Sequence, residues 1–181
     1  LGITVYYLSN PVQFDDLYPC IETIGLLTGH EQQAAELTAS LKTRVEKVTQ
    51  TVAVSSYAPV VFYELDGSDP AKPWTAGPGT FVDQMIQMAG GINVGASMQD
   101  AWAQISLEQL LVADPDLILL GDAAYGMTPD QVAARNGWQT LKAIENGNIY
   151  EFNDDLASRP GPRLVDGLEE LAKILHPELF E

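Results

Sequence analysis

The chain has little of what disulfide, metal and membrane proteins depend on. It contains one cysteine and two histidines in 181 residues, so no internal disulfide can form, and no group of Cys and His has zinc-site spacing. Cys20 lies on the apolar side of an expected helix, which predicts a buried small side chain. There is no run of about eighteen apolar residues, so the sequence predicts no membrane-spanning helix.

Basic residues are also scarce. Nine Lys and Arg stand against 25 Asp and Glu, which gives a formal net charge of −16. This balance argues against nucleic acid as a partner, because phosphate backbones would be repelled. The same negative field would speed association with a basic partner surface, and the alternative interpretation is that the charge serves solubility alone.

The motifs of phosphate binding and nucleophilic catalysis are missing as well. Neither Gly-x-x-x-x-Gly-Lys nor Gly-x-Gly-x-x-Gly occurs. His30 and His176 both fall at expected helix ends, where a cation is favoured, and neither has an evident metal or catalytic partner. Gly77-Pro78-Gly79 precedes an expected helix and could hold an anion there, although a rigid turn is the simpler interpretation.

The overall composition is that of an ordinary globular domain, with 46% hydrophobic and 19% charged residues. At this length we expect one α/β domain with a substantial core. Apolar periodicity and turn residues predict strands over 1–8, 58–65, 92–94, 116–120 and 148–152. They predict helices from Asn10-Pro11, from about His30 to Val48, after Thr80, after Ser106, over 138–145 and after Pro162. From residue 58 onward strands alternate with helices, which predicts a mostly parallel sheet covered on both faces.

Three aromatic residues in expected loops are candidates for ligand contact. Trp74 lies in a Gly- and Pro-rich loop over 66–79, and Trp102 and Tyr125 lie in loops that follow or adjoin expected strands. Loops beyond the carboxyl ends of strands form the binding crevice of open α/β sheets, where aromatic rings offer flat apolar area. The alternative is that each ring anchors its own loop. Trp138 falls in a helical pattern and is expected in the core.

The segment that begins at Trp102 carries several signals in a row. Ser106 and Gln109 have the spacing of a capping box at the start of a helix. Glu108, one turn inside that helix, is placed to contact a partner. Asp114-Pro115 then forms a turn before a fully apolar strand. This combination favours a solute-binding lobe over an enzyme.

Arg159 belongs to the one compact basic feature, Arg159-Pro160-Gly161-Pro162-Arg163. The residue before a proline is held extended and does not enter the helix. An arginine held in this way can reach toward a carboxylate or phosphate in a crevice. The alternative is a surface ion pair with Asp154 or Asp155.

Landmarks along nearly the whole chain resemble one family. They are Leu1-Gly2-Ile3-Thr4-Val5, Ile24-Gly25-Leu26-Leu27-Thr28-Gly29, Gly77-Pro78-Gly79-Thr80-Phe81-Val82-Asp83, Ala89-Gly90-Gly91-Ile92-Asn93-Val94, the run 102–111, Ala113-Asp114-Pro115-Asp116-Leu117-Ile118, Ser158-Arg159-Pro160-Gly161-Pro162-Arg163 and Leu175-His176-Pro177-Glu178-Leu179-Phe180. In this order they are similar to the substrate-binding proteins of ABC importers for ferric siderophores, haem and cobalamin. Each landmark alone is weak, and their order carries the resemblance.

The resemblance implies two α/β lobes joined by one long rigid helix, with the ligand in the cleft between them. We then expect residues 1–29 to be a remnant of the first lobe, residues 30–52 the connecting helix and residues 53–181 the second lobe. The second lobe would be a three-layer, Rossmann-like unit with a mostly parallel sheet. On this interpretation the chain is a C-terminal fragment. That would explain its abrupt start on an apolar segment, without an initiator Met or a secretory signal.

The resemblance also implies roles for individual residues. A tryptophan in the position of Trp102 lines the cleft of cobalamin-binding relatives, and a glutamate in the position of Glu108 docks onto arginines of the membrane permease. Arg159 resembles a position near the cleft of siderophore binders. The metal of such ligands arrives already chelated, so we expect no protein metal site and no cofactor. The implied location is extracytoplasmic, either periplasmic or as a membrane-anchored lipoprotein.

Two other functions stay open at this point. An enzyme on a doubly wound fold would need a phosphate loop or a catalytic histidine, and a pure interaction module would have packed aromatics and no ligand. The sequence does not choose among cobalamin, haem and ferric siderophores, although Trp102 favours a corrinoid. An unpaired first strand would also expose an apolar edge, from which we expect self-association of the isolated piece.

Overall fold

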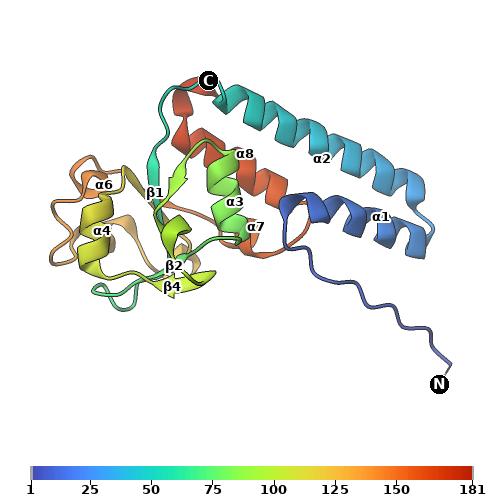
Figure 1. Cartoon of the computed structure of the whole chain (residues 1–181), viewed down its shortest axis with the longest axis horizontal. Coiled ribbons are helices and arrows are strands. Elements are labelled where there is room, and N and C mark those ends of the chain that lie inside the picture. The colour runs from blue at the N-terminus through green and yellow to red at the C-terminus, as the bar shows by residue number, and fades with distance from the viewer. Residues whose placement is uncertain (1, 181) are drawn as a thin grey trace.

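The computed structural model describes residues 2–180 and shows an α/β fold (Figure 1). The strands are β1 (Val60–Asp66), β2 (Trp74–Ala76), β3 (Ile92–Asn93), β4 (Trp102–Gln104), β5 (Leu117–Leu120) and β6 (Ile149–Glu151). The helices are α1 (Leu17–Thr28), α2 (Glu31–Val52), α3 (Phe81–Met88), α4 (Leu107–Ala113), α5 (Pro129–Ala133), α6 (Lys142–Glu145), α7 (Asp155–Ser158) and α8 (Leu164–Leu175). No helix within the described range is long and apolar enough to cross a membrane.

The sheet is mostly parallel, as expected. Its strands run in the order β4-β2-β1-β5-β6, and β3 also pairs with β1. The pairs β1–β3, β1–β5 and β5–β6 are parallel, whereas β2 is antiparallel to both β1 and β4. All four residues of β5 are buried, because a central parallel strand is covered on both faces.

Each face of the sheet has its own hydrophobic core. One core joins the side of β1 that carries Tyr63 to α1, α2, α3 and α8. The other joins the side that carries Phe62 to α4 and the segments around α5 and α6. Trp138 is fully buried there and meets Phe62 edge-on, with ring centroids 6.1 Å apart. The core prediction for Trp138 is therefore confirmed, although it precedes α6 instead of lying inside a helix.

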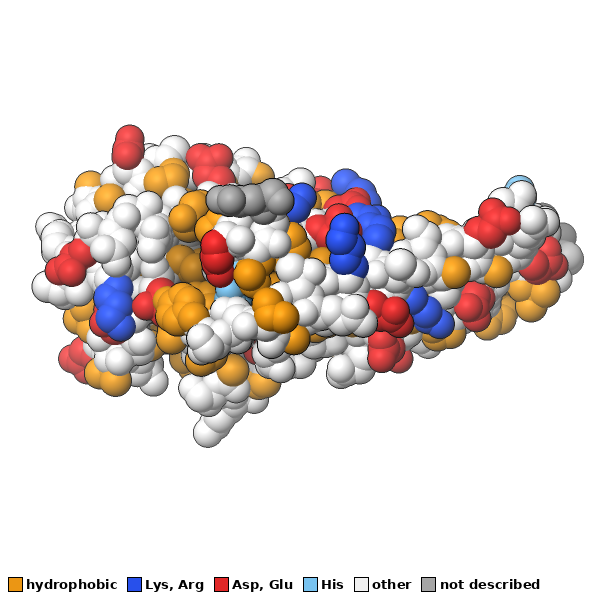
Figure 2. Space-filling view, turned by 90° about the horizontal axis from the view of Figure 1, so that it is seen from above, with side chains coloured by type: hydrophobic (Ala, Val, Ile, Leu, Met, Phe, Trp, Pro, Cys, Tyr) orange, Lys and Arg blue, Asp and Glu red, His pale blue; other side chains and the backbone are white. Residues whose placement is uncertain are grey.

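Helix α2 is the long helix that the periodicity predicts, and α1 folds back along it as a hairpin (Figure 1). Gly29 ends α1 in the left-handed conformation. Gly25 allows the close approach of the two helices, since a Cβ there would lie 2.4 Å from the Cβ of Ala34. The pair forms an arm that extends from the bulkier body that contains the sheet (Figure 2).

The structure differs from the sequence-based expectations near the N-terminus. Residues 2–8 form no strand, and the apolar side chains Ile3, Val5 and Tyr7 are exposed. A strand needs a neighbour to satisfy its backbone, and none of the described strands pairs with this segment. Leu1 lies outside the described residues. The self-association that we expected from an unpaired strand edge stays a prediction, although residues 2–8 do not form that strand.

Other local differences are smaller. The helix expected from Asn10 begins instead with a 3-10 turn at Phe14 and becomes α1 at Leu17. Cys20 is half-buried, and its Sγ lies 3.8 Å from the carbonyl of Ser9. The last helix, α8, buries all six residues expected to face inward: Leu164, Val165, Leu168, Leu171, Ala172 and Leu175.

Candidate functional site

Trp74 and Trp102 lie on adjacent strands and not in loops. Trp74 begins β2 and faces Gln104, and Trp102 begins β4 and faces Ala76. Successive side chains of a strand point to opposite faces, so Trp102 and Gln104 share a face. Trp74 lies opposite Gln104, and both tryptophans therefore project to the same side of the sheet. As diagonal neighbours their Cα atoms are about 7–8 Å apart. Their side chains are 39% and 43% exposed, and we call this pair the aromatic strip.

Gly77 holds the two strands of the aromatic strip together at one end. Its backbone N–H donates to the carbonyl of Ala101 at 2.7 Å. A Cβ at this position would lie 2.1 Å from the carbonyl oxygen of Asp100, so only glycine fits. Thr80 then caps α3 by accepting the N–H of Asp83. The Gly77-Pro78-Gly79 segment is thus a rigid turn.

Tyr125 borders a cavity at the carboxyl ends of β1 and β5. The cavity has a volume of about 330 Å³ and is lined by Leu65, Asp66, Ser68, Asp122, Tyr125 and Met127. Tyr125 is 91% exposed, at the end of a 3-10 turn that follows β5. Asp66 lies opposite Trp74, beyond an irregularity in the pairing that follows Glu64, so the backbone at the acidic cavity adjoins that of the aromatic strip. Carboxyl ends of parallel strands are where open α/β sheets bind ligands.

A buried ion pair lies next to the acidic cavity. Arg135 donates to both carboxylate oxygens of Glu64, at 2.5 and 2.9 Å, and to the carbonyl of Gly67 at 3.2 Å. Its guanidinium also lies 4.6 Å from the ring centroid of Trp138. Burial raises the pKa of Glu64, and the two hydrogen bonds from Arg135 oppose that shift. The pair fixes the end of β1, from which Asp66 projects.

Arg159 forms an ion pair with a neighbouring aspartate. It follows α7, and its Nε donates to a carboxylate oxygen of Asp155 at 2.7 Å. The side chain is 70% exposed. The structure therefore shows the surface ion pair that was the alternative interpretation. The neighbouring Asp154 instead accepts a hydrogen bond from the Tyr63 hydroxyl at 2.5 Å and ties the segment after β6 to β1.

Glu108 is exposed in the first turn of α4, as expected. The capping box is formed, because Gln109 donates its N–H to the Ser106 hydroxyl while its side chain accepts the Ser106 N–H. Glu108 borders an apolar groove of about 380 Å³ between α4 and the segment after β3. None of the residues that line this groove lines the acidic cavity.

The two histidines lie at the ends of different helices. His30 is exposed at the start of α2, where its Nδ1 lies 3.2 Å from the Thr28 hydroxyl. His176 ends α8, is fully buried, and makes no hydrogen bond through either ring nitrogen. Within residues 2–180, no three His, Cys, Asp or Glu side chains are grouped so as to hold a metal ion.

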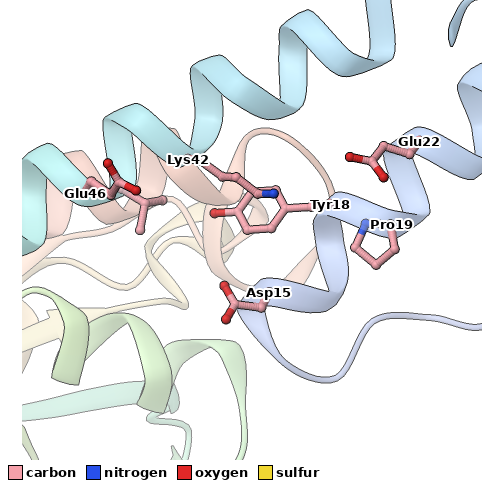
Figure 3. Close-up of a pocket in the computed structure, with 7 residues that line it drawn as sticks. Asp15, Tyr18, Pro19, Glu22, Lys42 and Glu46 are labelled. Atoms are coloured by element: carbon pink, nitrogen blue, oxygen red, sulfur yellow. The ribbon is translucent and has the colours of Figure 1, made fainter.

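Another cavity lies on the arm. It has a volume of about 440 Å³ and lies between α1 and α2 (Figure 3). Lys42 lies over the ring of Tyr18, 4.9 Å from its centroid, with Asp15, Glu22 and Glu46 around it. Because these acidic groups surround a lysine that already contacts an aromatic face, the cavity is a solvated helix junction.

Sequence reasoning missed the acidic cavity. Asp66 follows the strand expected over 58–65, and Asp122 comes two residues after the strand expected over 116–120; that position was the available signal. The pairing of Glu64 with Arg135, 71 residues apart, has no signal in the sequence. The strand β2 was also missed, because three residues inside a segment rich in Gly and Pro do not show an alternating pattern.

Comparison with known proteins places this geometry in a family. The sequence model of the family described as periplasmic binding protein matches residues 1–156. The chain belongs to this family. The fold class and family predicted from the sequence are therefore confirmed, and the family's members are binding proteins and not enzymes.

Several relatives match almost the whole chain. An uncharacterized ABC transporter substrate-binding lipoprotein of Bacillus subtilis, YvrC, is 30% identical over 180 residues, which are 99% of this chain and 56% of the relative. A cobalamin-binding protein of Halobacterium salinarum is 31% identical over 182 residues, which are 97% of this chain and 48% of the relative. The chain thus spans about half the length of the curated relatives it matches.

Solved structures show the same fold. A possible iron-binding (periplasmic solute-binding) protein of Staphylococcus epidermidis superposes with a TM-score of 0.83 at 28% identity, covering 97% of this chain and 67% of that one. The periplasmic vitamin B12 binding protein of Vibrio cholerae superposes with a TM-score of 0.77 at 24% identity, covering 97% and 66%. The second likeness concerns the fold alone.

Proposed function

We propose that this chain forms the ligand-binding lobe of an extracytoplasmic solute-binding protein that delivers a chelated metal compound to an ABC importer. The ligand class is cobalamin, a ferric siderophore or haem. The observation that carries the proposal is the aromatic strip, two half-exposed tryptophans side by side on adjacent strands. Flat apolar area of this kind fits a large planar ligand. Relatives named as cobalamin-binding support it.

In this proposal the long helix joins two lobes. Residues 30–52 form the connector, residues 53–181 form the second lobe, and residues 1–29 belong to the first lobe. The rigid α2 in the structure supports the role of connector, because it runs along α8 and holds it through an ion pair. The protein would be periplasmic or anchored to a membrane as a lipoprotein, as the name of the Bacillus relative suggests.

Different residues have the roles of contacting the ligand and of docking onto the permease. Trp102 and Trp74 contact the ligand's flat face, and Tyr125 contacts its rim at the acidic cavity. Arg159 contributes once the ligand or a conformational change frees it from Asp155. Glu108 docks onto a basic residue of the permease, which its exposure in the first turn of α4 permits.

The test is a titration of the natural full-length protein. Cyanocobalamin, haemin and ferrichrome are added separately while tryptophan fluorescence is followed, and Trp102→Ala is compared with wild type. We expect saturable quenching by one ligand and at least a tenfold weaker affinity in the variant, since losing one aromatic contact in a desolvated site is worth about 1–3 kcal/mol.

Tyr57→Ala provides the matched control. Tyr57 is also an exposed aromatic, but it precedes β1 and lies at the opposite end of that strand from the acidic cavity. Its substitution leaves the affinity unchanged. If none of the three ligands quenches the fluorescence of the wild type, the proposed ligand class is wrong.

A further inference from the structure

Asp122 lines the acidic cavity, and one of its carboxylate oxygens accepts no hydrogen bond. Its side chain lines the cavity, and the residue is only 7% exposed. Oδ2 accepts the backbone N–H of Gly67 at 2.9 Å, whereas Oδ1 is buried and makes no hydrogen bond. A buried acceptor without a donor is costly and is rarely left so unless something else supplies the donor.

The charged groups that act on Asp122 are Arg135 and Asp66. Neither donates a hydrogen bond to its Oδ1. Asp66 lies on the same cavity wall, and the N–H of Ser68 lowers the pKa of its carboxyl, which is therefore ionised. Burial raises the pKa of Asp122. The nearest cation, Arg135, is already bound to Glu64 and Gly67. The N–H of Gly67 and the charge of Arg135 oppose the raised pKa of Asp122, but no donor pairs with its Oδ1.

The position of the cavity connects it to the aromatic strip. Asp66 pairs in register with Trp74, so a ligand lying flat on the strip would extend its rim over Asp66. Tyr125, almost fully exposed, forms the outer border of the same cavity. The aromatic strip and the acidic cavity are therefore neighbours through the pairing of Trp74 with Asp66.

We infer that the acidic cavity is a subsite for a hydrogen-bond donor on the ligand's rim, a primary carboxamide or an ammonium group, with Asp122 as the main acceptor. This inference rests on the proposed function and narrows its ligand class. Corrinoids carry carboxamide side chains around their ring, and these donate to a carboxylate. Haem carries propionates and catecholate siderophores are anionic, so Asp66 and Asp122 would repel both.

The alternative is that Asp122 only holds the turn at Gly67. Asp122→Asn separates the two roles, because an amide oxygen can still accept the Gly67 N–H while its NH₂ group turns the free acceptor into a donor. A purely structural role would leave ligand preference unchanged. A recognition role would shift the preference away from amides and toward carboxylates.

The experiment uses the natural full-length protein and two probes with the same corrin ring. Dicyanocobinamide carries carboxamides, and dicyanocobyrinic acid carries carboxylates in their place. Wild type is expected to prefer the amide form by roughly 10- to 100-fold, the worth of one or two hydrogen bonds to a charged acceptor. Asp122→Asn should reduce this preference at least tenfold. Affinities are measured by tryptophan quenching.

Two further variants complete the test. Asp69→Asn removes one negative charge from the segment that follows Asp66, outside the cavity lining, and should preserve the preference. Asp66→Asn changes an exposed residue of the cavity. It provides a second test if Asp122→Asn fails to fold. It should also lower the preference for the amide form.

The outcomes separate the two proposals. If wild type binds cobinamide and both cavity variants keep its preference within twofold, the subsite is wrong while the proposed function stands. If wild type binds haemin or ferrichrome and neither corrinoid, the solute-binding role stands and the subsite is wrong. If it binds none of the four probes, both proposals fail.

Discussion

At the scale of residues, the Glu64–Arg135 pair is the most constrained feature of the site. Their side chains are 0% and 6% exposed, so each charge depends on the other in a medium of low polarity. Such a pair adds little net stability compared with apolar residues of the same volume, but breaking it leaves an uncompensated buried charge. Its function here is to hold the carboxyl end of β1 and the loop that contains Gly67.

Arg135→Met tests this interpretation. We expect the free energy of unfolding at pH 7 to fall by about 3–5 kcal/mol, because Glu64 stays buried without its cation. The double variant Glu64→Leu with Arg135→Met should recover most of that loss. Urea denaturation followed by circular dichroism measures both, and equal stability of the single and double variants would contradict the prediction.

The same variant should also respond to pH in a defined direction. Burial already raises the pKa of Glu64 above its ordinary value of 4.5, and removing Arg135 removes the groups that oppose this shift. A carboxyl with a raised folded-state pKa is stabilising when protonated, and this contribution is lost as the pH rises through that pKa. Arg135→Met should therefore approach wild-type stability as the pH is lowered from 7 toward 4.5.

At the scale of elements, the long helix depends on its contact with α8. Arg44 of α2 donates to Glu169 through two nitrogens at 2.8 Å and to Asp166 at 2.6 Å. The groups are about one-third to one-half exposed, so solvent screens them and the network contributes only about 1 kcal/mol. Its value is geometric, because it fixes the direction in which the arm leaves the sheet.

Arg44→Ala should lower the free energy of unfolding by about 1 kcal/mol at low salt, and less at high salt. The hydrogen bonds from Arg44 lower the pKa of Glu169 below its ordinary 4.5. This contribution is present above pH 4.5 and is lost as the pH falls through the folded-state pKa. The difference between wild type and variant should therefore shrink in acid. A difference that is constant between pH 7 and pH 3 would show that the network is not its cause.

At the scale of the whole molecule, charge and shape separate two surfaces. The aromatic strip and the acidic cavity lie on β1, β2, β4 and the segment after β5, whereas Glu108 lies on α4 beside an apolar groove. The net charge of −16 favours a basic partner surface for the second region, with an association rate that depends on salt. The residues that line the acidic cavity and those that line the groove beside Glu108 are different sets, so the two proposed roles can be tested separately.

Glu108→Lys should separate these two surfaces. Ligand affinity is expected to stay within twofold of wild type, because Glu108 lies outside the acidic cavity. Stimulation of the cognate importer's ATPase, reconstituted in lipid nanodiscs, should fall at least tenfold, since a like charge replaces an attractive one. Glu151→Lys, an exposed glutamate on β6, is the charge-matched control. Equal stimulation by both variants would exclude Glu108 from docking.

The sequence by itself determined the elements with strong local signals. The four apolar residues of β5, the capping box at Ser106 and the inward face of α8 each follow from a pattern within a few residues, and each is confirmed. The order of landmarks determined the family. In these cases the period of the apolar residues indicates the type of element, and the capping residues indicate where the helix begins.

Tertiary structure alone decided which distant residues share a site. It placed Trp74 and Trp102 on paired strands, brought Arg135 to Glu64, and left one oxygen of Asp122 without a donor. It also left residues 2–8 without a partner strand. The physical reason is that strand pairing and burial of charge depend on contacts between segments far apart in the chain, and the period of a single segment does not encode them.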